Sequence, residues 1–282
     1  HHLVLLDDSL SMSDRWGETD AFAEAKKTLR KLVEEGARRP GTQKLTVLLL
    51  SEPEQPFING EEINEQLLIK LSDDLQTLDS THRSLNLLDG LDAARQRLLD
   101  QKAISRTLHV VSDFRTHDWS TQPALGKSIK SFEETDIAVN LVRAVPEPHV
   151  NLALTDLAGD LQTAAVNVPL RLTATIVNHS EAKADNLRLS VTQDGKKLPV
   201  AIPVDAIEGG ETASKTFEVV FGSPGRHQLE VALDADAVAA DNARFLVVDL
   251  LDSNPVLLID GNPDAIDAEL IADALAADPS LT

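Results

Sequence analysis

Short apolar segments alternate with amphipathic segments over the first half of the chain. The amphipathic segments repeat hydrophobic residues at helical spacing, which predicts helices packed on one face. Strands that are apolar on both faces are typical of a parallel sheet covered by helices on both sides. The predicted strands are residues 3–6, 45–50, 107–112 and 137–142, and the predicted helices are residues 19–39, 61–75, 85–100 and 122–135. Residues 1–145 are therefore predicted to form an α/β domain with a mainly parallel sheet.

The pattern changes after residues 145–149 (VPEPH), where two prolines mark a linker. Apolar and polar residues then alternate with a period of two, and the apolar positions are rich in Val and Leu. An Asp-Gly pair inside QDGKK predicts a tight hairpin turn. The predicted strands lie within residues 166–178, 186–202, 212–221, 227–233 and 243–250. We therefore predict an all-β, Ig-like sandwich over residues 150–250.

A third pattern begins at residues 254–261 (NPVLLIDG), which predict a parallel strand. A helical pattern follows in residues 264–282, and a strand and helix of this kind need a larger sheet to cover. Residues 254–282 are thus expected to be the start of a truncated α/β segment. The first apolar strand already begins at residue 3, so we expect the chain to be an excised piece of a longer protein.

Charge and composition narrow the possible functions. The formal net charge is -20, and most of it lies after residue 150. Such a surface repels phosphate backbones, so we expect no nucleic-acid partner. The chain has no Cys, which excludes disulfides, thiolate nucleophiles and Cys-ligated zinc. No run reaches the roughly 18 apolar residues of a membrane span.

Polar side chains follow two of the predicted parallel strands directly. Asp7, Ser9 and Ser11 form a D-x-S-x-S pattern after the first strand, and Asp113 follows residues 107–112. Because the carboxyl ends of parallel strands meet at one edge of a sheet, these side chains are expected to converge. Carboxylate and hydroxyl oxygens suit Mg²⁺, which keeps water in its remaining positions. Residues 79–94 supply a further hydroxyl just before a predicted helix.

These motifs together resemble the metal-ion-dependent adhesion site (MIDAS) of von Willebrand factor A (VWA) domains. The flanking LDDSLSMSDR and VVSDFRTHDW are similar to those of bacterial Bat-type, aerotolerance-related, membrane-anchored VWA proteins. The resemblance continues through an Ig-like domain that closes on LDADAVAADNARFLVVDL. It ends with VLLIDG, which opens a glutamine-amidotransferase-like α/β domain in those proteins. The implied fold is a Rossmann-like VWA domain, an Ig-like sandwich and the incomplete segment.

The resemblance implies a set of metal ligands. Asp7, Ser9 and Ser11 correspond to the first ligand loop, and Asp113 to the carboxylate of the third. The middle ligand aligns with Ser84, or alternatively with Thr81, because this loop departs from the usual spacing. The implied cofactor is Mg²⁺, with Mn²⁺ or Ca²⁺ as alternatives, and no catalytic residue is implied. A different interpretation makes Ser9 and Ser11 a simple turn and Asp7 a helix N-cap.

Two other charged residues adjoin this predicted set. Asp8 is either an acceptor behind the ligands or a solvated loop carboxylate, and Arg115 is a candidate for the rim of the site.

The resemblance also implies a function. It favours a non-enzymatic interaction module whose bound cation captures an acidic side chain of a protein partner. Family members work beside MoxR-type AAA+ ATPases, and the parent protein is expected to be membrane-anchored with periplasmic soluble domains. The β-sandwich is expected to act as a spacer or a second docking surface.

Three alternative functions remain, the third of which comes from the resemblance. Carboxylates and a hydroxyl around Mg²⁺ also describe a phospho-acceptor or phosphoryl-transfer domain, although Ser9 breaks the D-x-D pattern of phosphatases. The domain could instead be a scaffold with a degenerate metal site. A catalytic role for the amidotransferase-like segment is a further alternative, but the chain contains no Cys to act as its nucleophile.

Overall fold

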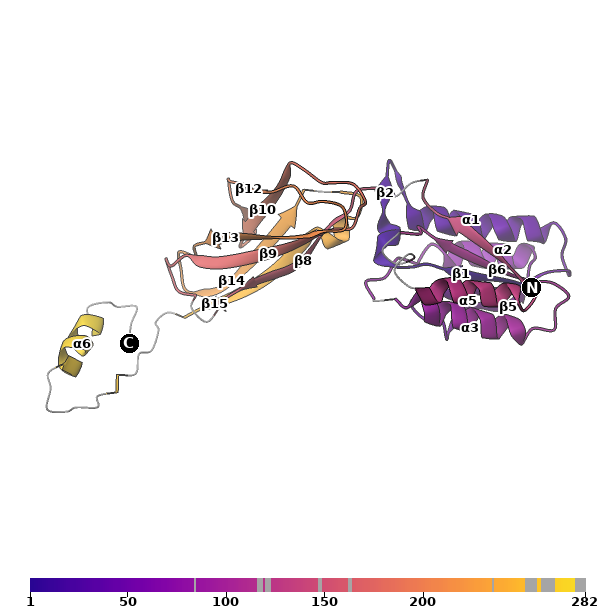
Figure 1. Cartoon of the computed structure of the whole chain (residues 1–282), viewed down its shortest axis with the longest axis horizontal. Coiled ribbons are helices and arrows are strands. Elements are labelled where there is room, and N and C mark those ends of the chain that lie inside the picture. Colours follow the sequence, from indigo (N-terminus) through magenta and orange to yellow (C-terminus); the bar gives the residue numbers. More distant parts are fainter. Residues whose placement is uncertain are drawn as a thin grey trace. The chain divides into compact units, whose positions relative to one another are not determined.

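The computed structural model describes residues 1–83, 85–115, 119, 123–146, 149–161, 164–234, 236–251, 258–259 and 267–276. Contacts within the chain define two compact units (Figure 1). The first contains residues 1–151 together with 235–240, and the second contains residues 152–234 together with 241–282.

A five-stranded mixed sheet forms the centre of the first unit. Its strand order is β5-β4-β1-β6-β7, in which β4, β1, β6 and β7 are parallel and β5 is antiparallel to β4. The four parallel strands were predicted from their apolar runs. The antiparallel edge strand was not, because PFINGEE is largely polar. The bounds are β1 His2–Leu6, β4 Lys44–Leu49, β5 Pro56–Glu62, β6 Arg106–Ser112 and β7 Ile137–Arg143.

Helices cover both faces of this sheet, as the apolar runs predict. Alternate residues of β1 enter two separate cores: Val4 and Leu6 pack on the side of α1 and α2, and Leu3 and Leu5 pack on the side of α3 and α5. The helices are α1 Ala21–Ala37, α2 Glu65–Asp74, α3 Leu87–Leu99 and α5 Pro123–Glu133, and the short strands β2 Arg15–Trp16 and β3 Thr19–Asp20 precede α1. Side chains of Asp20, Asn64 and Asn86 cap the first three helices.

The order of the strands places a switch point at β1. The chain leaves β1 and returns as β4 on one side, and it later returns as β6 on the other side. In sheets of this kind ligands bind beyond the carboxyl ends of the strands at the switch point. The loops after Leu6, Leu49 and Ser112 meet at that edge.

The second unit is a sandwich of two antiparallel sheets, β11-β10-β14-β15 with β12 on β10, and β13-β9-β8. At the predicted Asp-Gly turn, Asp194 and Gly195 both have positive φ, and Gln193 pairs with Lys196. This confirms the hairpin. The bounds are β8 Leu152–Gly159, β9 Leu170–Asn178, β10 Leu187–Gln193, β11 Lys196–Lys197, β12 Ile202–Val204, β13 Thr212–Val219, β14 Gly225–Leu233 and β15 Ala243–Leu250.

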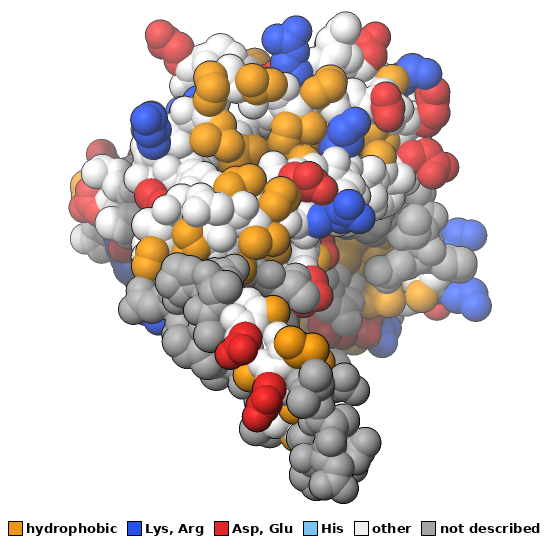
Figure 2. Space-filling model, turned by 90° about the vertical axis from the view of Figure 1, so that its left-hand side faces the viewer, with side chains coloured by type: hydrophobic (Ala, Val, Ile, Leu, Met, Phe, Trp, Pro, Cys, Tyr) orange, Lys and Arg blue, Asp and Glu red, His pale blue; other side chains and the backbone are white. Residues whose placement is uncertain are grey.

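Inward-facing residues of both sheets form the core of the sandwich, among them Leu172, Ile176, Val191 and Val231. On the opposite face of the edge strand β15, Phe245 and Val247 are exposed at alternate positions. Figure 2 shows further hydrophobic side chains on the surface seen from this end of the chain. The outer face of β15 therefore carries two exposed apolar side chains beside the charged Asp249.

The helical pattern near the end of the chain is seen as α6 Asp267–Ala276. Most of the predicted strand at 254–261 lies outside the described residues. No helix in the described part of the chain combines the length and the apolar composition needed to cross a membrane.

Candidate cation site

The ends of β1 and β6 bring Asp7 and Asp113 to the same edge of the sheet. The Asp7 amide donates to the Val111 carbonyl at 2.9 Å, which extends the strand pairing up to the first carboxylate. Ser112 then joins the two acids: its hydroxyl donates to Asp7 Oδ2 at 2.6 Å and lies 3.4 Å from Asp113 Oδ1. Since a hydroxyl has a single proton, the short contact with Asp7 takes it. Sequence reasoning missed Ser112. The feature that could have indicated it is a polar residue at the end of a buried apolar strand.

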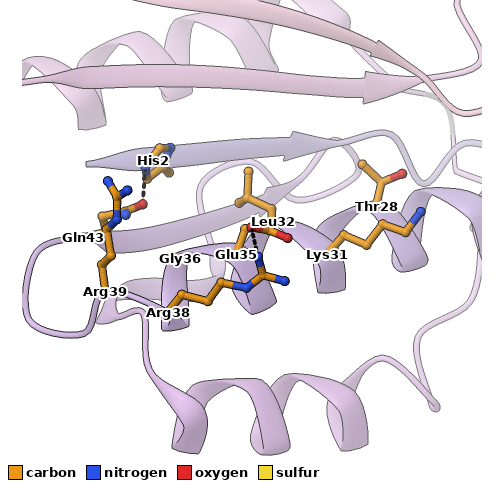
Figure 3. Close-up of a pocket in the computed structure, with 9 residues that line it drawn as sticks. All are labelled: His2, Thr28, Lys31, Leu32, Glu35, Gly36, Arg38, Arg39 and Gln43. Carbon is orange, nitrogen blue, oxygen red and sulfur yellow. Dashed lines mark hydrogen bonds and ion pairs between the residues drawn. The ribbon is translucent and has the colours of Figure 1, made fainter.

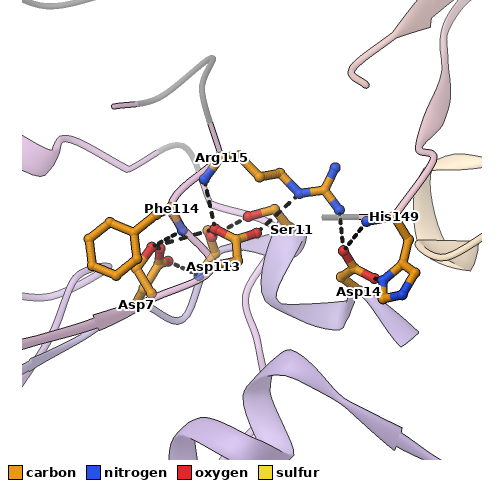
Figure 4. Close-up of polar contacts among 9 residues, drawn as sticks. Asp7, Ser11, Asp14, Asp113, Phe114, Arg115 and His149 are labelled. Atoms are coloured by element: carbon orange, nitrogen blue, oxygen red, sulfur yellow. Dashed lines mark hydrogen bonds and ion pairs between the residues drawn. The ribbon is translucent and has the colours of Figure 1, made fainter. Parts of the chain in front are cut away.

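The D-x-S-x-S loop folds back on Asp7. The Ser9 amide donates to Asp7 Oδ1 at 2.9 Å, and the hydroxyls of Ser9 and Ser11 lie 3.0 Å apart. Met12, in the 3₁₀ turn Leu10–Ser13, is buried and anchors the loop. Figure 4 labels Ser11, Asp7 and Asp113 in one view of this region. These contacts suit a ligand loop and also a plain turn, so the ligand roles stay predictions.

Burial gives the Asp7 carboxylate unusual electrostatics. The exposed fractions are 6% for Asp7 and 1% for Asp113. Burial, and then the negative charge of Asp113, raise the pKa of Asp7 to about 6, although the hydrogen bonds from Ser112 and Ser9 oppose the shift. Two acids held together away from water favour a proton or a cation between them.

The middle loop lies against the first loop through backbone and hydroxyl contacts. The Thr81 amide donates to the Asp8 carbonyl at 2.7 Å, and the hydroxyls of Ser13 and Ser80 are 3.0 Å apart. The Thr81 hydroxyl accepts from the Arg83 amide at 3.2 Å. Ser84, the other candidate ligand, lies outside the described residues. The structure thus brings Thr81 to the neighbourhood of the site and leaves the choice of middle ligand open.

Asp8 is a buried acceptor rather than a solvated carboxylate. Its two oxygens accept from the Ser51 amide at 2.9 Å and the Ser51 hydroxyl at 2.5 Å. Ser51 follows β4, so the pair fastens the first loop to the neighbouring strand end.

Replacing Ser51 with Ala is expected to lower the free energy of unfolding by about 1–2 kcal/mol, because Asp8 keeps the amide donor and loses the hydroxyl. Urea unfolding of the variant measures this loss. Ser72→Ala, which removes a hydroxyl bonded only within α2, is the matched control. Equal stability of the Ser51 variant and the wild type would contradict the role assigned to this bond.

Arg115 is buried inside the site rather than lying on its rim. Its Nε donates to Asp113 Oδ2 at 3.1 Å and its Nη2 to Asp14 Oδ2 at 2.8 Å. The intervening Phe114 has a φ of +54°, a left-handed conformation that costs energy for a side chain of this size. This turn lets Asp113 and Arg115 both point inward. Sequence reasoning did not find Asp14, which has no motif of its own.

The oxygen atoms present fit a hard divalent cation. Within the described part of the chain, no three His, Asp or Glu side chains gather into a metal-binding group. A cation here would therefore rely on two carboxylates, on hydroxyls and on retained water, which is a donor set suited to Mg²⁺. Arg115 holds Asp113 Oδ2, whereas Oδ1 has only long contacts of 3.4 Å. Asp113 Oδ1 is thus the carboxylate oxygen best able to accept a cation.

A cavity of about 580 Å³ lies at the other end of β1 (Figure 3). It is lined by one stripe of α1, including Lys31 and Glu35, by Arg39 just after the end of that helix, and by His2 and Gln43. Since His2 begins β1 and Asp7 follows its end, this cavity is separate from the candidate cation site.

Comparison with known proteins concerns mainly the second unit. The fold of this unit defines an Ig-like antiparallel sandwich. Residues 154–243 match the family model of the CARDB domain, so the sandwich is similar to domains of that family. A search of the curated proteins gave no match.

Solved structures similar to the chain include three of interest. A CARDB domain from Pyrococcus furiosus is 13% identical, covering 36% of this chain and 90% of that one with a TM-score of 0.31. An aerotolerance-related membrane protein from Bacteroides fragilis is 18% identical, covering 56% and 70% with a TM-score of 0.39. A putative cell surface protein domain from Methanosarcina acetivorans is 21% identical, covering 36% and 93% with a TM-score of 0.30.

Proposed function

We propose that this chain is a non-enzymatic interaction module that binds a divalent cation and captures an acidic group of a protein partner. The first unit acts as a VWA-type domain, and its cation site is a MIDAS. Asp7, Ser9, Ser11 and Asp113 hold the ion, with Ser84 or Thr81 as the middle ligand. The observation that carries the proposal is the pair of buried acids at the ends of β1 and β6, where burial and Asp113 raise the pKa of Asp7 to about 6.

The cation supplies positive charge at an otherwise acidic edge, and a position left to water offers a partner carboxylate a place to bind. Mg²⁺ suits the oxygen donors, with Mn²⁺ and Ca²⁺ as alternatives. Ser112 and the Ser9 amide orient Asp7, and Arg115 orients Asp113. In this proposal these residues hold the ligands in place and have no catalytic role.

The proposal places the module in a larger, membrane-associated protein with periplasmic soluble domains. The motifs similar to Bat-type proteins support this setting, and so does the order of the predicted domains. A MoxR-type AAA+ ATPase system is the proposed partner. The CARDB-type sandwich is proposed as a spacer or second docking surface, and residues 254–282 as the start of a glutamine-amidotransferase-like domain.

Isothermal titration with Mg²⁺ and Mn²⁺ tests the cation site. The wild type is expected to bind with saturation, and a variant carrying Asp7→Ala and Asp113→Ala is expected to show no binding. The matched control is a variant carrying Asp73→Ala and Asp92→Ala, which removes the same charge from an exposed position on α2 and an exposed position on α3. Absence of saturable binding by the wild type, or equal binding by the two variants, would sink the proposal.

The affinity for Mg²⁺ is expected to depend on pH, because the ion needs the ionised form of Asp7. With a pKa of about 6 for Asp7, the dissociation constant should be nearly constant above pH 7. Below pH 6 it should rise by about tenfold per pH unit. Titrations between pH 5 and pH 8 at constant ionic strength measure this slope. An affinity that is unchanged between pH 5 and pH 7 would show that Asp7 is not a ligand.

A further inference from the structure

A chain of buried ion pairs leads away from the candidate cation site. Arg115 bridges Asp113 and Asp14, with exposed fractions of 6% for its side chain and 0% for Asp14. The other oxygen of Asp14 lies 2.7 Å from His149 Nδ1, and the His149 amide donates to Asp14 Oδ2 at 3.2 Å. Figure 4 shows the four side chains in this order. The loops after β1 and β6 are thus joined to the segment that follows β7.

The geometry of Arg115 makes the links interdependent. A guanidinium is planar and its donors are fixed relative to one another, so Nε and Nη2 cannot be repositioned separately. A movement of Asp113 that turns Nε also turns Nη2, which donates to Asp14. Asp14 accepts from Arg115 and from the His149 amide at the same oxygen, Oδ2. A displacement at one end therefore disturbs the hydrogen bonds at the other.

His149 is the adaptable end of this chain. It lies between β7 and β8, three residues before β8 begins at Leu152. Its side chain is 32% exposed, and its ring stacks on Trp16 with centroids 5.6 Å apart. The other three members are almost wholly buried. Changing His149 is therefore the mildest way to break the chain without opening the core.

The charges allow a cation at Asp7 and Asp113 and the ion pair between Arg115 and Asp14 to be present at the same time. Asp7, Asp113 and Asp14 carry three negative charges when ionised, and Arg115 carries one positive charge. A divalent cation brings this group to neutrality, so its attraction to the three acids outweighs its repulsion from one guanidinium at similar distances. A bound cation also fixes the Asp113 carboxylate. Less conformational entropy is then lost when Arg115, Asp14 and His149 are held in place.

We propose that Arg115 is a positioning residue of the cation site, and that through Asp14 it couples cation binding to the hold on His149. This inference rests on the proposed function. Coupling between two sites is reciprocal, so the cation tightens the His149 contacts by the same factor by which those contacts tighten cation binding. The segment leading into β8 then responds to whether the cation is bound.

The test compares His149→Ala and His149→Gln with the wild type. His149→Ala is expected to weaken Mg²⁺ binding by about three- to tenfold, within the usual range of coupling energies. Gln restores a side-chain donor toward Asp14 but not the ring on Trp16, so His149→Gln is expected to stay within about twofold of the wild type. Hydrogen exchange of the His149 amide gives a second measurement, which is expected to slow in the wild type by a similar factor when Mg²⁺ is added.

The outcomes separate this inference from the proposed function. If the wild type binds no Mg²⁺, both the function and the coupling are overturned. If the wild type binds Mg²⁺, while His149→Ala keeps the same affinity and the His149 amide exchanges equally with and without the ion, the coupling alone is wrong. Weak binding in both variants would assign the effect to the ring stack with Trp16, which also overturns the role of Asp14.

Discussion

Replacing Asp7 with Asn is expected to stabilise the cation-free protein at pH 7 and to abolish cation binding. The pKa of Asp7 is raised from 3.8 to about 6, so its ionised form is disfavoured in the folded protein. At 1.36 kcal/mol per pKa unit the penalty is of order 3 kcal/mol. Asn removes the charge and keeps the shape: its Oδ1 accepts from the Ser9 amide, and its Nδ2 donates to the Ser112 hydroxyl.

The effect has a definite pH window. Because the folded protein holds the Asp7 proton more tightly than the unfolded chain, the contribution of Asp7 to stability declines as pH rises from about 4 to about 6 and is constant above. The Asp7→Asn variant is thus expected to have a higher free energy of unfolding than the wild type at pH 7.5, and this difference is expected to vanish near pH 3.5. Urea unfolding of the wild type and the variant at both pH values measures it, with Asp73→Asn as the exposed control. A variant less stable than the wild type at pH 7.5 would refute this electrostatic account.

Opposite effects on stability and binding are what a functional site leads one to expect. A structural carboxylate is held by partners that lower its pKa, whereas Asp7 is held close to Asp113 by the ends of two strands. Local features that cost stability persist where function requires them. The left-handed backbone of Phe114, between Asp113 and Arg115, is a second cost at the same place.

The sequence predicted the elements whose patterns are regular. The parallel strands are apolar on both faces, and the Asp-Gly turn has a specific conformational requirement, so both were found. The edge strand β5 has one exposed face and contains Gly60, so its sequence lacks the continuous apolar run that identified the parallel strands. Strand β8 was missed because its register shifts between Leu154 and Asp156, and a bulge of this kind breaks the period of two.

The candidate site was predictable only where it follows strand ends. Asp7 and Asp113 come directly after apolar runs, so the topology of a parallel sheet was enough to bring them together. Arg115 and Asp14 are 101 positions apart, and Asp14 and His149 are 135 positions apart. Contacts between loops at such separations leave no period in the sequence. They depend on the fold as a whole, which is why this chain of ion pairs emerged only from the structure.

Replacing Arg115 with Met is expected to lower the free energy of unfolding by about 3–5 kcal/mol, because it leaves buried carboxylates without their cationic partner. Met has a similar length and fills the space, so the loss reports charge rather than a cavity. Asp113 loses its shortest hydrogen bond, and Asp14 loses the 2.8 Å bond from Arg115 Nη2, which leaves His149 as its remaining partner in this chain. Arg115→Lys is expected to lose less, since an ammonium keeps the charge but cannot reproduce the planar fork.

Urea unfolding with and without Mg²⁺ distinguishes the two roles of Arg115. If Asp113 binds the cation, Mg²⁺ replaces part of the missing positive charge. Saturating Mg²⁺ should then raise the unfolding midpoint of Arg115→Met, in line with stabilisation by any ligand of the folded state. The variant carrying Asp7→Ala and Asp113→Ala should not respond. An Arg115→Met protein as stable as the wild type would show that the buried pairs contribute nothing net. A destabilised variant that ignores Mg²⁺, beside a wild type that responds to it, would show that Asp113 cannot hold the ion once Arg115 no longer positions it. A wild type that also ignores Mg²⁺ would show that Asp113 binds no cation.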